Sequence, residues 1–361
     1  MRLIFAKQKI FITYSLFTIT YHLITQEDIT MKKIFGSLEG GSVERQEKKK
    51  FTVTLIYATI VLIVCLLATL LVVQVVASIK AKKAAENPPA DDGANSNYIA
   101  LQVDAAKLDT GSLILVNKNN EYIFANNPEV VSFPTSGNKY GLKDGTLKAN
   151  PTALTAFNDM MDALYKNVPE ADIVVMTAYR TKEYQDSLGN GTPGGYSDFH
   201  TGLSFELKDG NKYDDSYDNI DDLDKYDWLY KNAHKYGFIV RYPANIPESD
   251  TGKNAGKSFS AITGVDDYAY VFRYVGIAHA TYIYQNELCL EEYLELIRTS
   301  HAYGSSLSIK GADSRSYEVY YFAATGDSTE LQVPVKYAYE ISGDNMNGYI
   351  VTVCKSKANK N

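Results

Sequence analysis

The chain has 361 residues, with 43 acidic against 36 basic side chains and a formal net charge of −7. This length leaves room for one or two domains whose cores are large enough to fold without disulfide bonds. No strongly basic domain accompanies the acidic balance, so nucleic acid is not expected as a partner.

Residues 51–79 carry no charged side chain and are almost wholly apolar. As a helix they are long enough to span a bilayer. Six basic residues between positions 32 and 50 precede this segment, and three between 80 and 83 follow it. Basic residues favour the cytoplasmic side, so we expect a single-pass, uncleaved anchor in the cell membrane with the C-terminal body outside the cytoplasm.

The flanks of the predicted membrane helix complete the N-terminal organisation. Residues 1–50 are expected to be a cytoplasmic tail, for which Met31 is an alternative start. Residues 80–99 contain Pro, Gly and many polar residues with nothing to bury, which is typical of a flexible linker.

In the rest of the chain, segments with the spacing of apolar residues typical of helices alternate with segments typical of strands. Residues 113–117 are predicted as a strand, residues from Pro151 as a helix capped by Asn150, and residues 173–176 as a buried strand. Next come a helix over 228–236 that ends at Gly237 and strands over 238–243 and 271–275. A later helix has one apolar face, made by Leu290, Tyr293, Leu294 and Ile297. The spacing is not that of repeated βαβ units, so we predict an α+β fold with a mainly antiparallel sheet flanked by helices.

The last part of the chain differs in composition. Short alternating segments at 317–322, 330–333 and 349–353 are separated by Gly, Asp and Asn turns. We therefore predict a main domain over residues 100–303 and a small β appendage over residues 304–361.

Two segments of the main domain resemble the signature of VanY-type D-alanyl-D-alanine carboxypeptidases. Residues 196–206 read Tyr-Ser-Asp-Phe-His-Thr-Gly-Leu-Ser-Phe-Glu, where the family has Tyr-Ser-Glu-His-x-Thr-Gly-Leu-Ala-x-Asp. Residues 268–276 read Tyr-Ala-Tyr-Val-Phe-Arg-Tyr-Val-Gly, where the family has Glu-Pro-Trp-His-x-Arg-Tyr-Val-Gly. Further matches in the family's order extend the resemblance from Leu101 to about Tyr303.

The resemblance implies a zinc peptidase site with several residues replaced. In the family, two His and one Asp bind zinc, and a Glu takes the proton of the attacking water. Those ligand positions are Phe199, Glu206 and Val271 here, and the base position is Tyr268. Phenyl and isopropyl groups have no donor atom for a metal, and a tyrosine hydroxyl, with a reference pKa of about 10, is a poor proton acceptor. We therefore expect no cofactor.

The residues that the family uses to hold its substrate are retained. The resemblance gives Arg180 the role of gripping the terminal carboxylate of D-Ala-D-Ala, with Gln185 and Ser197 beside it. Two alternatives stay open. Arg180 could pair with a carboxylate of the protein such as Glu206, and a shifted register could bring His200 and Glu206 together as ligands of a rearranged zinc site.

Three hypotheses about function follow. The first is a membrane-anchored, exported homologue of the cell-wall carboxypeptidases that is catalytically inactive and binds peptidoglycan stem peptides ending in D-Ala-D-Ala. The second is an active D,D-carboxypeptidase with a rearranged zinc site. The third is a non-catalytic scaffold or assembly protein, with a protein partner that the sequence does not identify.

Overall fold

The computed structural model describes residues 97–358, apart from 125–126, 135, 211–215, 251–253 and 267. The predicted tail 1–50, the predicted membrane helix 51–79 and nearly all of the predicted linker 80–99 lie outside these residues. Within the described ranges, no helix is both long and apolar enough to cross a membrane.

A six-stranded sheet forms the centre of the main domain. Its strands lie in the order β3 (Gly141–Leu142), β5 (Ile173–Thr177), β6 (Ser204–Gly210), β9 (Val271–Tyr274) and β8 (Phe238–Val240), and β7 (Tyr217–Asn219) also pairs with β6. Only the β3–β5 pair is parallel. The predicted α+β fold with a mainly antiparallel sheet is therefore confirmed for the described residues, although the predicted strand 238–243 ends at Val240.

Helix α3 (Pro151–Asn167) covers this sheet and shows why the local sequence folds as it does. The Asn150 side chain accepts hydrogen bonds from the backbone N–H groups of Thr152 and Ala153, and proline fits the first helical turn. The buried face of the helix packs onto β6, where the rings of Phe157 and Phe205 stack 4.6 Å apart. The predicted cap and start of this helix are confirmed.

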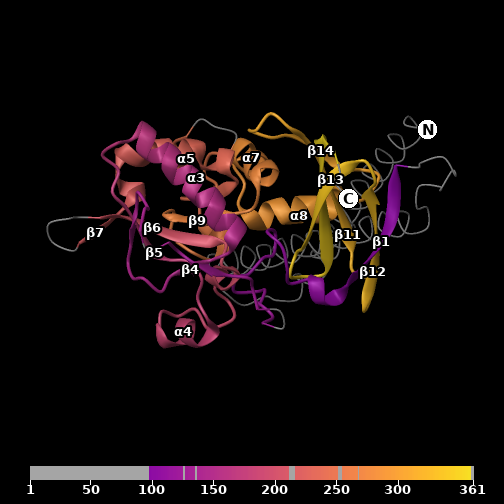
Figure 1. The fold of residues 1–361 in the computed structure, drawn as a ribbon, viewed down its shortest axis with the longest axis horizontal. Helices are drawn as coiled ribbons and strands as arrows, with labels where there is room; N and C mark the ends of the chain where they lie inside the picture. The colour runs from indigo at the N-terminus through magenta and orange to yellow at the C-terminus, as the bar shows by residue number, and fades with distance from the viewer. Residues whose placement is uncertain are drawn as a thin grey trace, which may run out of the picture. The chain divides into compact units, whose positions relative to one another are not determined.

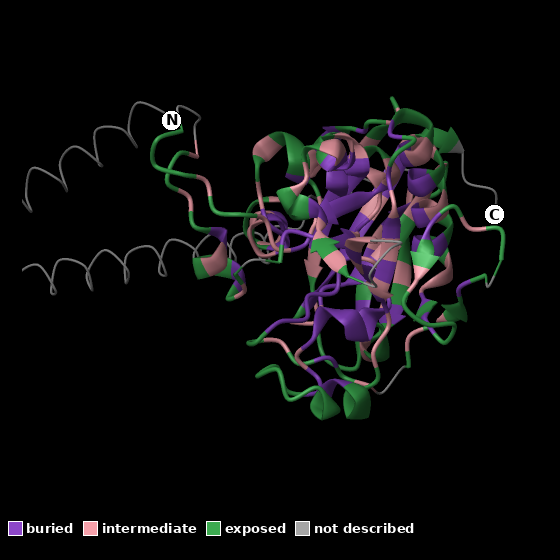
Figure 2. Cartoon of the chain, turned by 90° about the vertical axis from the view of Figure 1, so that its left-hand side faces the viewer, coloured by how far each residue is buried: buried purple, intermediate pink, exposed green. Residues whose placement is uncertain are grey.

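The other short elements of the main domain lie around this sheet. They are β2 (Val131–Ser132), β4 (Lys148–Ala149), α4 (Lys182–Ser187), the 3-10 turn η2 (Asp198–Thr201), η3 (Ile220–Asp222), η4 (Asp224–Tyr226), α5 (Asp227–Asn232), η5 (Ala233–Tyr236) and α6 (Phe259–Thr263). The predicted helix 228–236 thus continues as a 3-10 turn from Ala233 and ends, as expected, at Gly237 in the left-handed conformation. Figure 2 shows the buried residues filling the interior and the exposed ones on outer loops and short helices.

Two packed β layers make up the C-terminal part. A four-stranded sheet has the order β10 (Leu307–Lys310), β11 (Ser316–Ala323), β14 (Gly348–Ala358) and β13 (Tyr337–Gly343). The second layer pairs β12 (Ser328–Pro334) with β1 (Tyr98–Asp104), and the 3-10 turn η1 (Ala105–Lys107) comes directly after β1 in the chain. The strands predicted here are confirmed, and β1, β10 and β13 add to them.

Helices α7 (Ile277–Asn286) and α8 (Leu290–Ser300) join the two parts. Helix α8 runs between the central sheet and the C-terminal strands (Figure 1), and its buried side chains share one apolar cluster with residues of β11 and β14. The predicted apolar face of this helix is confirmed, since Leu290, Tyr293, Leu294 and Ile297 are all buried. The domain boundary predicted between residues 303 and 304 stays a prediction.

One predicted strand is wrong. Leu113 lies in a turn, and residues 114–116 belong to no strand. Two of their carbonyl groups accept hydrogen bonds from arginine side chains: Arg273 donates to Ile114 O at 3.0 Å, and Arg241 donates to Val116 O at 3.4 Å. Buried guanidinium groups thus donate hydrogen bonds that the N–H groups of a neighbouring strand would otherwise donate. A turn closed by a bridge between Asn117 and Asn120 follows this segment.

Candidate functional site

The central sheet brings two of the family's zinc-ligand positions together. Glu206 of β6 lies directly opposite Thr177 of β5 on one side and Val271 of β9 on the other. Residues opposite one another in antiparallel strands project to the same face of the sheet. Val271 is fully buried in this row, so it offers neither a donor atom nor access to solvent.

Arg180 follows β5 and reaches back over this row. Its Nε donates to Thr177 Oγ1 at 3.2 Å, one terminal nitrogen donates to Gln185 Oε1 at 3.0 Å, and the other donates to Glu206 Oε2 at 3.3 Å. The side chains of Arg180 and Glu206 are only 12% and 15% exposed. The pairing of Arg180 with a carboxylate of the protein, expected as one alternative, is therefore present.

Phe199 completes this arrangement from the turn η2. Its ring centroid lies 4.2 Å from the guanidinium carbon of Arg180, a distance at which a cation is attracted to the face of an aromatic ring. Phe199, at the family's first zinc-ligand position, therefore packs over the guanidinium group of Arg180. Burial raises the pKa of the Glu206 carboxyl against the opposing effect of Arg180, and burial likewise lowers the pKa of the Arg180 guanidinium against that of Glu206.

His200, the alternative zinc ligand, is fully buried with both ring nitrogens engaged. Nδ1 lies 2.7 Å from the carbonyl oxygen of Arg180, and Nε2 accepts a hydrogen bond from the backbone N–H of Gly195 at 2.9 Å. This pattern fixes a neutral ring that donates through Nδ1, and burial lowers its pKa. His200 therefore holds two backbone segments in place and has no nitrogen left for a metal.

The residues present do not fit a zinc ion. Two of the three family ligand positions have no donor atom, and the carboxylate of Glu206 already pairs with Arg180. In the part of the chain that the structure describes, no group of three His, Cys, Asp or Glu side chains is placed to hold a metal ion.

A pocket of about 590 Å³ lies in front of Arg180. Its lining includes all three residues expected to hold a substrate, Arg180, Gln185 and Ser197, together with Tyr268 from the base position. Tyr268 is 37% exposed and packs against two other tyrosine rings. The sequence comparison thus grouped four residues that the fold also brings together.

Other residues of this pocket were not foreseen from the sequence. They include Lys118 from the 117–120 turn, Asn190 from the loop after α4, and Tyr242 from the segment after β8. Gln185 holds that loop, since its side-chain nitrogen donates to Asn190 Oδ1 and to Thr192 O, each at 3.0 Å. A lysine in a polar turn carries no sequence signal that separates it from an ordinary solvated lysine.

A buried charge network fixes the turn that carries Ser197 and Phe199. Asp198 accepts a hydrogen bond from Arg273 at 2.6 Å and lies 3.2 Å from Nε of Arg241. Arg241 in turn makes a two-point contact with Glu291 at 2.9 and 3.1 Å. Burial alone would raise the pKa of Asp198, but the two guanidinium groups outweigh it and hold that pKa below its usual range.

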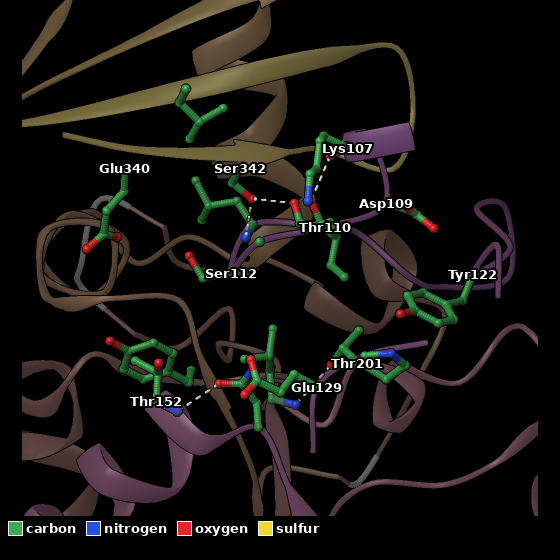
Figure 3. A pocket seen from close by; sticks show the side chains of 18 of the residues that line it. Lys107, Asp109, Thr110, Ser112, Tyr122, Glu129, Thr152, Thr201, Glu340 and Ser342 are labelled. Carbon is green, nitrogen blue, oxygen red and sulfur yellow. Dashed lines mark hydrogen bonds between the residues drawn. The ribbon is translucent and has the colours of Figure 1, made fainter. Parts of the chain in front are cut away.

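A second pocket, of about 560 Å³, shares no lining residue with the first. Figure 3 shows Thr110 and Ser342 on one side of it and Thr152 and Thr201 on the other. None of the residues expected to hold substrate or metal lines this pocket, so the candidate site is the pocket at Arg180.

Comparison with known proteins finds a family match in the central part of the chain. The model of the VanY D-alanyl-D-alanine carboxypeptidase family matches residues 146–255, which include α3, β5, Arg180, the turn η2 and β6. The chain carries a VanY-family domain. A D-alanyl-D-alanine carboxypeptidase of Enterococcus faecium is 26% identical over 75% of this chain and 84% of its own length.

Two further similarities are consistent with this assignment. A D-alanyl-D-alanine carboxypeptidase of Enterococcus faecalis is 45% identical over 69 residues, which cover 19% of this chain and 21% of that protein. The solved structure of the vancomycin-resistance D,D-dipeptidase VanXYg, in complex with a D-Ala-D-Ala phosphinate analogue, aligns with a TM-score of 0.59. That alignment covers 72% of this chain and 99% of the dipeptidase at 23% identity, which shows a shared fold.

Proposed function

We propose that this VanY-family protein is an exported, membrane-anchored homologue that binds peptidoglycan stem peptides ending in D-Ala-D-Ala and does not hydrolyse them. The observation that carries the proposal is the Arg180–Glu206 pair beneath the Phe199 ring. At this place the family chemistry needs three ligands around zinc and a carboxylate base. The chain provides a guanidinium group, one paired carboxylate and two apolar side chains instead.

Binding is supported by the donors that Arg180 keeps. A guanidinium group has five N–H donors, and three of those of Arg180 are used by Thr177, Gln185 and Glu206. Two N–H groups are left, as many as a carboxylate needs for a two-point contact. Arg180 lines the open pocket, whereas Glu206 does not, so a ligand carboxylate can approach without displacing Glu206.

The energetics of the pair also favour a role in binding. The pKa of Arg180 is lowered and that of Glu206 is raised, mainly by burial. For each group, the direction of the pKa shift means that burial disfavours the charged side chain more than the attraction between Arg180 and Glu206 favours it. Replacing a buried ion pair by apolar side chains is often nearly neutral for stability, and groups with perturbed pKa values cluster at functional sites, which is consistent with a role of this pair in binding.

The test combines zinc analysis with peptide binding on the purified full chain in detergent. We expect much less than one zinc per chain, no release of D-alanine from a stem pentapeptide, and binding of acetyl-D-Ala-D-Ala with a Kd between about 1 μM and 1 mM. The variant Arg180→Gln with Glu206→Gln removes both charges without leaving either one buried alone, and it should weaken binding at least tenfold. Lys182→Ala, which changes an exposed lysine outside the pocket lining, is the matched control.

Two outcomes would replace the proposal. One zinc per chain with D-alanine release would favour the enzyme with a rearranged site. Equal binding by the wild type and the double variant, or no binding by either, would favour the scaffold function.

Membrane anchoring is tested separately. With six basic residues before residues 51–79 and three after them, the C-terminal body should lie outside the cytoplasm. Protease added to intact cells stripped of their wall should degrade it, while a cytoplasmic marker protein stays intact. Full protection of the body would overturn the exported orientation.

A further inference from the structure

The pocket at Arg180 has an unbalanced positive charge. Among the described residues that line it there are two cationic side chains, Arg180 and Lys118, and no carboxylate. The charge of Arg180 is balanced from behind by Glu206. No carboxylate among the described residues forms an ion pair with Lys118, whose side chain lines the pocket.

The backbone that carries Lys118 is held firmly. The side-chain oxygen of Asn117 accepts hydrogen bonds from the backbone N–H groups of Asn119 and Asn120, at 2.9 and 3.1 Å. Its side-chain nitrogen donates to Glu291 at 3.2 Å, and Glu291 belongs to the buried charge network. The turn is thereby fixed to the same network that positions Ser197 and Phe199.

The side chain of Lys118 lies against Gly264, which has no side chain of its own. Gly264 ends α6 in the left-handed conformation with φ +75°. A Cβ atom at this position would lie 2.8 Å from Nζ of Lys118 and 3.0 Å from its Cδ and Cε atoms. Any side chain at position 264 would therefore push the ammonium group away from where it now lies on the pocket wall.

We propose that the pocket takes a peptide with two anionic groups, the C-terminal carboxylate at Arg180 and a second carboxylate, from an acidic residue of the same peptide, at Lys118. This inference rests on the proposed function, because it assumes that Arg180 receives the terminal carboxylate. Lys118 then selects among peptides with the same D-Ala-D-Ala end. An exposed ion pair contributes modestly, about 0.2–1 kcal/mol, which corresponds to a preference of up to about fivefold.

The experiment compares matched peptides on the full chain in detergent. The acidic peptides carry glutamate one, two or three residues before D-Ala-D-Ala, and each control peptide carries glutamine at the same place. For at least one pair the wild type should bind the glutamate peptide about two- to fivefold more tightly at low salt. The preference should vanish in Lys118→Ala and reverse in Lys118→Glu, whereas Lys182→Ala should keep it.

The outcomes separate this inference from the proposed function. Equal affinity for glutamate and glutamine peptides in all three pairs, or a preference that survives Lys118→Ala, would overturn the role of Lys118 while binding through Arg180 stands. Failure of the wild type to bind any of the peptides would overturn both. Unchanged affinity for the glutamine peptides in Lys118→Ala would show that the substitution leaves the rest of the pocket intact.

Discussion

Replacing Asp198 by asparagine tests the buried network on which the site is built. Asp198 has no exposed surface and balances two guanidinium groups, those of Arg273 and Arg241. Asparagine has nearly the same shape but no charge, so the network keeps two cations and only Glu291 as an anion. Removing one partner of a buried ion pair costs about 3–5 kcal/mol. For a protein of this size that loss lowers Tm by about 6–20 °C.

The assay is thermal unfolding of the full chain in detergent, followed by circular dichroism. Asp162→Asn serves as the control because its ion pair with Lys139 is exposed, at 65% and 51% of the two side chains. Loss of such a pair changes stability by less than about 0.5 kcal/mol. An Asp198→Asn protein as stable as the Asp162→Asn protein would refute the claim that the network stabilises the fold.

The same variant makes a prediction about pH. The pKa of Asp198 is lowered in the folded protein, so its ionised form contributes stability that is present above the unfolded pKa of about 3.9. That contribution is lost as pH falls through the folded pKa. The stability difference between wild type and Asp198→Asn should therefore be constant from pH 7 to 5 and smaller by about 1 kcal/mol at pH 3. A difference that grows on acidification would contradict this assignment of charge.

Two further predictions concern the family's metal positions. Replacing Arg180 by methionine together with Glu206 by leucine should leave the free energy of unfolding within about 1 kcal/mol of wild type. Arg180→Met alone should lower it by about 3 kcal/mol, because a buried carboxylate is left unpaired. Chemical denaturation measures both variants, and equal losses of stability would contradict this reasoning. Restoring all four family residues should create tight binding of one zinc per chain, measured by metal analysis after dialysis, and partial sets should bind far less because the ligands act jointly. That variant carries Phe199→His, Glu206→Asp, Tyr268→Glu and Val271→His.

Much of the fold followed from local signals in the sequence. The cap at Asn150, the stop at Gly237 and the apolar face of α8 each depend on residues within a few positions of one another, and all three are confirmed. The pairing of β1 with β12 was not foreseen, because its partners Tyr98 and Pro334 are more than two hundred positions apart and neither strand indicates the other. The strand predicted at 113–117 was wrong for a similar reason: its hydrogen-bond partners, which include Arg241, Arg273 and Asn345, are distant in sequence.

The candidate site was predictable where a motif carried it. The resemblance to the family's motifs pointed to four residues that the fold gathers around one pocket, namely Arg180, Gln185, Ser197 and Tyr268. It did not decide between a ligand and Glu206 as the partner of Arg180, because both are carboxylates and the choice depends on a distance in space. Lys118 was missed because its position depends on contact with Gly264, far away in sequence.

The pairing of β1 with β12 decides where mechanical load would enter the protein. Any pull on the chain from residues before Tyr98 is first borne by β1, whose seven residues form an antiparallel ladder with β12 from Tyr98–Pro334 to Asp104–Ser328. Those strands belong to the C-terminal layers (Figure 1), whereas Arg180 and Glu206 are held by the central sheet. If the chain is anchored and binds the wall as proposed, tension between the two would pass through this ladder, which lies outside the strands that shape the pocket.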